Sequence, residues 1–417
     1  MSPSGGGLPL HLPRLSAGVA VVLLLLATAC AGPAHASPPG PHQSATSEPP
    51  ARSSATPVPT SPVPTAFEPG SVSFISASIG WALGTVGTCA SCLALVRTAD
   101  GGASWQSIPA PRVPYVQQSD AARPATGVSR VRFANLEDGW AFGPGLVVTH
   151  DGGASWQELT PPGAVTALEA VSGRAYAIVA GPTSSAGRGT FTLYSSPVGK
   201  GDFQPVPGVT VTGFGPTVPG PIDPISLHSS GGRVAGFVLL ASNGTYGATP
   251  VLYGTADGVH WNRFPDPCAV TSGYQLGLTS FAMPDISTLD SLCSGNGAMG
   301  HTQKQVMRTS QGRTVAQGAP GSVGDGGQIA APSAQILLIA TASAASWIYR
   351  STDGGATWVT AIVYDDGGAG FTDFGCTTAT QCVAVRGQPA TQAQPQSANA
   401  LIMSGDSGLT WHKVTIG

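Results

Sequence analysis

Short apolar segments separated by Gly-rich turns follow one another along most of the chain. A first regular set occupies residues 72–75, 80–83, 92–96 and 104–108, and a second occupies 128–133, 139–142, 146–149 and 155–159. Both sets have Gly-Trp-Ala at the start of the second segment. Runs of this kind, bounded by turn residues, predict strands, and no stretch shows the spacing of an amphipathic helix. The pattern therefore predicts successive units of four strands.

The turn before the fourth strand carries a motif of Ser or Thr, Asp, Gly and Trp. Its clear copies contain Asp100 and Trp105, Asp151 and Trp156, Asp353 and Trp358, and Asp406 and Trp411, and a shortened copy contains Asp257 and Trp261. An Asp side chain accepts hydrogen bonds from the backbone N–H groups just after it, and Gly tolerates positive φ. The Trp ring offers a large apolar surface for burial. We therefore predict a structural role for these residues.

The spacing of the motif counts the units. Asp100 and Asp151 are 51 residues apart and Asp353 and Asp406 are 53 apart, whereas 106 residues separate Asp151 from Asp257 and 96 separate Asp257 from Asp353. Each long interval fits two units, so degenerate copies of the motif are expected within residues 193–203 and 308–315. The sequence thus predicts an all-β fold, a seven-bladed β-propeller of four-stranded antiparallel blades.

The pattern S/T-x-D-x-G-x-S/T-W resembles the Asp-box, or BNR repeat. With its Gly-Trp-Ala second strands, the stretch 67–417 is similar to the photosystem II assembly and stability factor family and to sortilin-type propellers, clearly in blades one, two, six and seven and poorly in blades three and five. The resemblance implies that the motif joins the third and fourth strands of a blade, on the side away from the usual ligand face. It also implies an interaction scaffold for peptides or proteins, and it carries over no ligand-contacting residue.

The first 30 residues have the layout of a bacterial export signal. His11 and Arg14 precede an apolar run over residues 17–26, which is too short for a comfortable transmembrane helix. The sequence that follows ends in Ala27-Thr28-Ala29-Cys30 and resembles a lipobox, with Ala27 where Leu is more usual. The resemblance implies a signal peptide over residues 1–30 and lipidation of Cys30. Ordinary cleavage after residue 36 is the alternative.

Residues 31–67 are dominated by Pro, Ser, Thr and Ala and have almost no aromatic side chains. Such a segment cannot bury enough surface to fold, so we expect a disordered linker between the anchor and a propeller over residues 68–417. The expected location is the outer face of the bacterial cytoplasmic membrane or the cell wall, with membrane contact through the lipid anchor only. A secreted protein is the alternative.

Charge and composition argue against several classes of function. The formal net charge is −3 and charged residues make up 9% of the chain, with no basic run, so nucleic-acid binding has no support. The Gly-rich stretches lie in β-turn contexts without a following helix, unlike phosphate-binding and dinucleotide-binding loops. We expect no cofactor, no bound metal and a monomer.

Six cysteines remain besides Cys30, and an even set in an exported chain predicts disulfides. Proximity favours three pairs, each clamping a local hairpin, although fifteen pairings are possible. The favoured pairs are Cys89 with Cys92, Cys268 with Cys293, and Cys376 with Cys382. The alternative for the first pair is a redox or metal site, but no second CxxC or paired His completes a zinc set.

Sialidases also carry Asp-boxes, so an enzyme must be considered. Their chemistry needs an arginine cluster for the substrate carboxylate, a Tyr nucleophile assisted by Glu, and an Asp acid/base. The first strand, residues 71–76, contains no Arg, and the glutamates after residue 70 are Glu137, Glu158 and Glu169. We therefore assign no catalytic residue. Three arginines meeting near a Tyr and a carboxylate at the central pore would favour the enzyme.

The long segment 109–127 between blades one and two supplies the candidate ligand face. It contains Arg112, Tyr115 and Arg123, residue types that dominate binding hot spots. A second long insertion covers residues 387–399, and a solvated loop without a partner is the alternative for both. The sequence favours a non-catalytic scaffold that binds an envelope protein or peptide, with a glycan as an alternative partner. A glycan-binding or glycan-cleaving envelope protein is the second interpretation.

Overall fold

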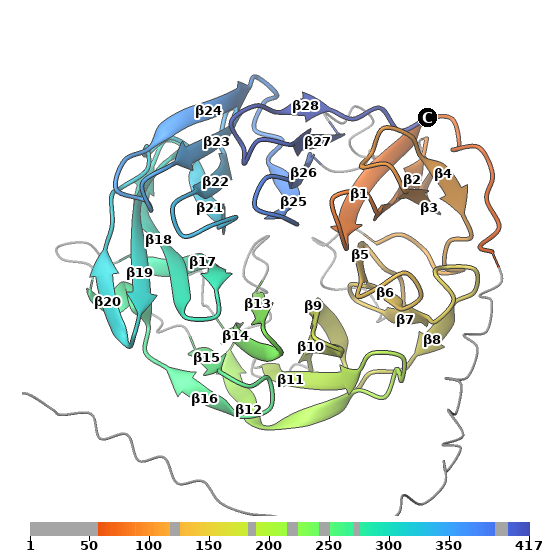
Figure 1. Ribbon diagram of the computed structural model, residues 1–417, viewed down its shortest axis with the longest axis horizontal. Coiled ribbons are helices and arrows are strands. Elements are labelled where there is room, and N and C mark those ends of the chain that lie inside the picture. The colour runs from red at the N-terminus through yellow and green to blue at the C-terminus, as the bar shows by residue number, and fades with distance from the viewer. Residues whose placement is uncertain are drawn as a thin grey trace, which may run out of the picture. The chain divides into compact units, whose positions relative to one another are not determined.

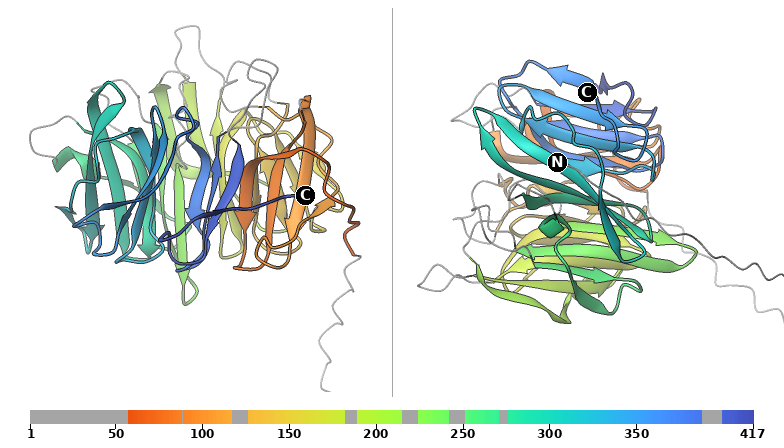
Figure 2. Two further views of the ribbon diagram at one scale, coloured as in Figure 1. Left: turned by 90° about the horizontal axis from the view of Figure 1, so that it is seen from above. Right: turned by 90° about the vertical axis from the view of Figure 1, so that its left-hand side faces the viewer.

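The computed structural model describes residues 57–87, 89–116, 126–181, 189–214, 224–241, 251–270, 276–387 and 399–417. These residues form seven four-stranded antiparallel sheets that stand as blades around a central axis (Figure 1), which confirms the predicted propeller. In each blade the strands follow chain order from the innermost to the outermost. Seen edge-on, the strands run roughly along the axis of the ring (Figure 2).

The first three blades come from the first half of the chain. Blade 1 contains β1 (Phe67–Phe74), β2 (Gly80–Val86), β3 (Cys89–Thr98) and β4 (Gln106–Ile108). Blade 2 contains β5 (Arg130–Phe133), β6 (Gly139–Phe142), β7 (Leu146–Thr149) and β8 (Gln157–Leu159). Blade 3 contains β9 (Ala164–Val171), β10 (Arg174–Ala180), β11 (Gly189–Pro197) and β12 (Gln204–Phe214).

Four further blades complete the ring. Blade 4 contains β13 (Ile225–Ser230), β14 (Arg233–Ala241), β15 (Val251–Thr255) and β16 (Trp261–Phe264). Blade 5 contains β17 (Gly277–Asp285), β18 (Thr288–Ala298), β19 (His301–Ser310) and β20 (Arg313–Ala316). Blade 6 contains β21 (Asp325–Ala330), β22 (Leu337–Ala342), β23 (Ser346–Ser351) and β24 (Val359–Tyr364). Blade 7 contains β25 (Phe371–Cys376), β26 (Cys382–Arg386), β27 (Ala400–Ser404) and β28 (His412–Lys413).

Helix is confined to one short 3-10 turn, η1 (Pro267–Val270), within the described residues. None of the helical structure described is long and apolar enough to cross a membrane. The two degenerate motif copies lie where the spacing predicts them. One forms the turn between β11 and β12 and the other the turn between β19 and β20, so both occupy the third-to-fourth strand corner of their blades.

The Asp-box turns share one hydrogen-bond pattern, which blade 1 illustrates. Asp100 Oδ1 accepts from the N–H of Ser104 at 2.9 Å and from Thr98 Oγ1 at 2.8 Å. Thr98 Oγ1 in turn accepts from the N–H of Gly102 at 2.9 Å, where φ is +92°. Equivalent bonds form around Asp151, Asp353 and Asp406. The side chain thus fixes a turn whose backbone favours Gly.

The Trp of each Asp-box packs against the preceding blade. Trp105 joins the cluster between blades 7 and 1, Trp156 that between blades 1 and 2, Trp261 that between blades 3 and 4, Trp358 that between blades 5 and 6, and Trp411 that between blades 6 and 7. The tryptophans of the Gly-Trp-Ala strands, Trp81 and Trp140, are fully buried. Trp81 stacks on Phe133 of the next blade with ring centroids 3.8 Å apart. The inter-blade clusters therefore hold the ring together.

Blades 1 and 7 meet without exchanging a strand, because each blade consists of four consecutive strands. Polar side chains join the two blades in addition to the apolar cluster that contains Trp105. Thr372 donates to Gly70 O, Asn399 to Pro69 O and Gln381 to Ala77 O. The segment before β1 adds to the outer edge of blade 1, where Ser61 and Ser107 exchange two backbone hydrogen bonds of 2.9 Å. We call the junction of blades 1 and 7 the seam.

All three favoured disulfide pairs are present. Cys89 and Cys92 lie at the start of β3, and Cys376 and Cys382 join β25 to β26 across the loop between them. The third pair differs from the expected hairpin clamp. Cys268 belongs to η1, so its bond to Cys293 ties the connection between blades 4 and 5 to β18.

Because the pKa values of the Asp-box carboxyl groups are lowered, we expect the protein to lose stability in acid. The hydroxyl and N–H of Ser104 lower the pKa of Asp100 to about 2, and those of Thr357 lower the pKa of Asp353 to about 2. Because these pKa values lie below the ordinary 3.8, the stabilisation is complete above about pH 4 and is lost as the pH falls towards 2. We expect the melting temperature to fall over that interval. A Ser104→Ala variant should show a smaller acid-dependent fall than the unsubstituted protein.

Candidate functional site

A cavity of about 480 Å³ lies inside the ring, against the inner strands of blades 3 to 7. Its wall consists of the ends of β9, β13, β17, β21 and β25 and of the loops that follow β21 and β25. Polar lining residues include Glu169, Ser226, His228, Ser280, Gln328 and Thr378. Since an inner strand pairs on one side only within its blade, its other edge faces the axis.

The cavity lies at the Asp-box end of the ring. Its wall includes Pro332 and Thr378, which belong to loops between first and second strands. These loops hydrogen-bond to the Asp-box turns of their own blades, Gly354 N–H donating to Gln335 O and Ser407 N–H to Thr380 O, both at 2.8 Å. The expected ligand face was the opposite one, and the described cavity is not lined by any residue of segment 109–127.

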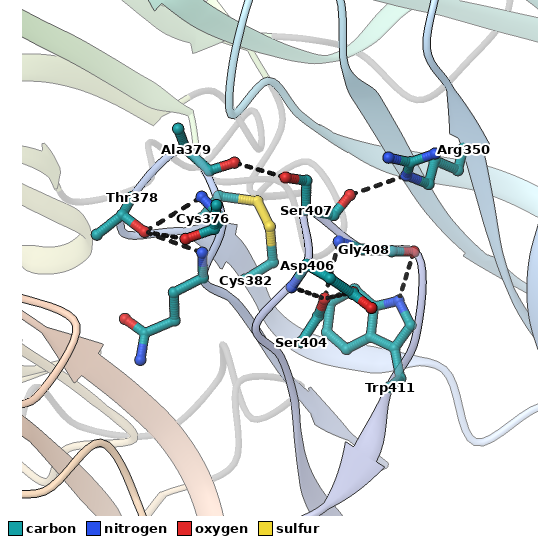
Figure 3. The surroundings of a disulfide bond; sticks show 12 residues. Arg350, Cys376, Thr378, Ala379, Cys382, Ser404, Asp406, Ser407, Gly408 and Trp411 are labelled. Atoms are coloured by element: carbon teal, nitrogen blue, oxygen red, sulfur yellow. Dashed lines mark hydrogen bonds between the residues drawn. A yellow bond between two sulfur atoms is a disulfide. The ribbon is translucent and has the colours of Figure 1, made fainter.

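The loop after β25 forms one side of the cavity rim and is fastened at several points. The Cys376–Cys382 disulfide closes its base, and Cys376 and Thr378 line the cavity. Figure 3 shows the disulfide beside the Asp-box turn of blade 7, where Ser407 Oγ donates to Ala379 O at 2.8 Å. Arg350 of blade 6 donates through Nε to Ser407 O at 2.9 Å. Contacts from blades 6 and 7 therefore fasten this part of the rim.

The side of the axis next to blades 1 and 2 is filled by a charged cluster. Arg132 of β5 donates to both carboxylate oxygens of Asp373 on β25, at 3.1 and 3.2 Å, and through Nε to Glu169 on β9. Asp373 Oδ2 also accepts from Ser71 Oγ at 2.7 Å and from the N–H of Val72 at 3.0 Å. One guanidinium and one carboxylate thus connect blades 1, 2, 3 and 7.

Electrostatics favour the ionised form of this cluster. Burial alone would raise the pKa of Asp373, but the charges of Arg132 and Arg130 and the hydrogen bonds hold it below its ordinary value. Bidentate Arg–carboxylate pairs of this geometry are among the stronger ionic contacts in proteins. We conclude that the cluster is a structural link across the seam, which also brings Glu169 to the cavity wall.

Two of the sequence-selected ligand residues, Arg112 and Tyr115, are described, and neither lines the cavity. Arg112 is exposed. Tyr115 is half-buried, and its hydroxyl lies so close to Gly70 that a Cβ there would be 2.4 Å from it. Burial raises the pKa of Tyr115, so the phenol stays neutral. Arg123, Cys30 and residues 388–398 of the insertion 387–399 lie outside the described residues. Tyr115 packs against β1.

The sialidase criterion is met only in part. Two arginines, Arg130 and Arg132, approach the axis with carboxylates and Tyr115 nearby. Both come from the single strand β5, and Arg132 is paired with the chain's own Asp373 and Glu169. Among the described residues, no arginine lines the cavity and no group of three metal-ligating side chains is found.

Comparison with known proteins places the chain by its fold alone. No protein-family model matches the chain, and no curated protein matches it. A structure of YCF48 bound to D1 peptide is similar, with 16% identity, 84% of this chain and 97% of that chain covered, and a TM-score of 0.47. YCF48 from Cyanidioschyzon merolae has 15% identity, 84% and 98% coverage and a TM-score of 0.48. The Hadza microbial sialidase Hz136 has 10% identity, 68% coverage of both chains and a TM-score of 0.40.

Proposed function

We propose that this protein is a non-catalytic binding module of the bacterial cell envelope, which takes an extended peptide segment of an exported partner into the cavity inside the ring. The observation that carries this proposal is the wall of the cavity, built from the axis-facing sides of inner strands, which pair with no other strand of the described blades. Backbone N–H and C=O groups along a strand edge bind an extended chain by strand addition. Small hydroxyl side chains at Ser226 and Thr378 leave room beside those edges.

The charge of the cavity selects among peptides. Its described lining residues include no Lys or Arg, and its one carboxylate, that of Glu169, is already paired with Arg132. An acidic peptide therefore finds no cationic side chain on the described wall. Complementary charge sets specificity and association rate more than raw affinity. We therefore propose that the preferred segment is neutral or basic, and that acidic segments are rejected.

The test measures binding of short peptides that alternate Ala with Lys, Ser or Glu to the full-length protein. We expect the Lys and Ser peptides to bind and the Glu peptide to bind at least tenfold more weakly. Ser226→Trp, which fills the cavity, should abolish binding. Val359→Trp is the matched control, because Val359 is 64% exposed on β24 and away from the cavity wall. Equal binding by all three peptides, or binding that survives Ser226→Trp, would contradict the proposal.

The glycan interpretation is decided by the same variants. If a panel of glycans binds or is cleaved and Ser226→Trp abolishes that activity, the cavity is a sugar site instead.

The location at the membrane is part of the proposal and has its own test. Cys30→Ala should release the protein from membranes into the medium.

A further inference from the structure

We infer that a slot between blades 2 and 3 is a second binding site, which accepts a tryptophan side chain of a partner protein. The slot has a volume of about 260 Å³ and is separate from the cavity inside the ring. Blade 2 contributes Leu146, Leu159, Thr160, Pro161 and Pro162 to its wall, and blade 3 contributes Val165, Ala177, Val179, Tyr194, Gly201, Asp202 and Phe203.

The pairing of the third and fourth strands shows which residue of blade 3 corresponds to the Asp-box Trp of the other blades. In blade 1, Arg97 pairs with Gln106, so Trp105 is the residue before the first paired position of the fourth strand. In blade 3, Ser195 pairs with Gln204, which gives Phe203 the same place. Blade 3 is one of the two blades with a degenerate Asp-box. The phenyl ring of Phe203 therefore occupies the position at which blades with the full motif have the indole ring of a Trp.

The other blades show what fits this position. Five inter-blade clusters each contain an Asp-box indole packed against the preceding blade, and three of those rings donate Nε1 to the carbonyl of the turn. Trp156 donates instead to Pro109 O of blade 1 at 3.0 Å. At the junction of blades 2 and 3, Phe203 packs against the corresponding cluster and lines the slot. The fold thus repeats an indole site five times, and at this sixth junction a slot of about 260 Å³ remains beside the smaller ring of Phe203.

The slot is large enough and has suitable chemistry. Apolar cavities of about 150 Å³ hold benzene, so the 260 Å³ here exceeds the need of one aromatic ring. Its wall combines aliphatic and proline side chains with the rings of Tyr194 and Phe203. Thr160 and Asp202 supply oxygen acceptors for an indole N–H. Aromatic rings gain from edge-to-face contact with other rings as well as from burial.

The occupant must come from another molecule. All eight tryptophans of the chain lie in the described ring, at positions 81, 105, 140, 156, 261, 347, 358 and 411. Seven of them belong to the inter-blade clusters already described or pack beside them, and Trp347 packs against the cluster of blades 5 and 6. The partner is therefore a protein or peptide that presents an exposed Trp.

The experiment measures binding of N-acetyl-tryptophanamide to the full-length protein by ligand-observed NMR, with N-acetyl-alaninamide as the comparison. We expect the tryptophan derivative to bind and the alanine derivative not to bind. Phe203→Trp should fill the slot and weaken binding at least tenfold, and Leu159→Glu, which places a charge on the wall, should do the same. Val359→Trp adds an exposed indole elsewhere and should leave binding unchanged.

Two results would overturn the inference. One is equal binding of the tryptophan derivative to the unsubstituted protein and to both slot variants. The other is no binding at the solubility limit of the derivative. Because Ser226→Trp leaves the slot intact, it should not affect N-acetyl-tryptophanamide. The slot and the peptide-binding cavity can therefore fail independently.

Discussion

Replacing Asp373 with Ala should lower the free energy of unfolding by roughly 3–5 kcal/mol, because the substitution leaves Arg132, whose side chain is only 11% exposed, without its bidentate partner. It also removes the acceptor of Ser71 and of the Val72 N–H. These hydrogen bonds and ionic contacts lie at the seam, where blades 1 and 7 share no strand that would hold them together in their absence. Denaturant unfolding followed by tryptophan fluorescence would measure it.

Two controls separate the charge from the general effect of losing a carboxylate. Asp373→Asn keeps an oxygen acceptor for Ser71, so its cost should be smaller than that of the alanine variant. Asp365→Ala removes an exposed carboxylate in the loop before β25 and should change stability little. If Asp373→Ala proves as stable as Asp365→Ala, the cluster does not hold the seam.

Trp81→Ala should be comparably damaging, at about 3–5 kcal/mol, because Trp81 is fully buried and stacks on Phe133 across the junction of blades 1 and 2. The Asp-box residue Trp358 is half-buried, so Trp358→Ala should cost less. Trp81→Phe keeps most of the ring, and no described residue accepts a hydrogen bond from Trp81 Nε1, so little polar stabilisation is lost. Thermal unfolding of the three variants tests this order. A larger loss for Trp358→Ala than for Trp81→Ala would contradict it.

The repeat explains why the fold could be predicted from the sequence. An Asp-box specifies its turn through bonds within a few residues, as between Asp100 and Ser104, so the motif is visible in any one copy. A ring of such units then fixes the blade count even where blades three and five have lost the motif. The disulfide pairs Cys89–Cys92 and Cys376–Cys382 followed from proximity for the same reason, since both are local.

The interior of the ring could not be predicted in this way. Arg132 and Asp373 are 241 residues apart in the chain and meet only because the seam closes the ring. A signal was present, because Arg130 and Arg132 are charged residues in a first strand that is otherwise apolar. The residues that pair with these arginines could not be predicted from the sequence of that strand. Tyr115 was selected for its residue type in a long loop, whereas its ring packs against Gly70 of β1.

The way the chain enters blade 1 has a mechanical consequence for a protein held through Cys30, as we propose. Residues preceding β1 run along the outer edge of the blade, where two hydrogen bonds join Ser61 to Ser107. Val63 packs against the cluster that lies between blades 7 and 1. Tension along the tether would load these outer contacts first and reach the Asp373 cluster only after they had parted. The short segment 57–66 would then detach from blade 1 before the propeller itself came under load, which would protect the ring from forces at the cell surface.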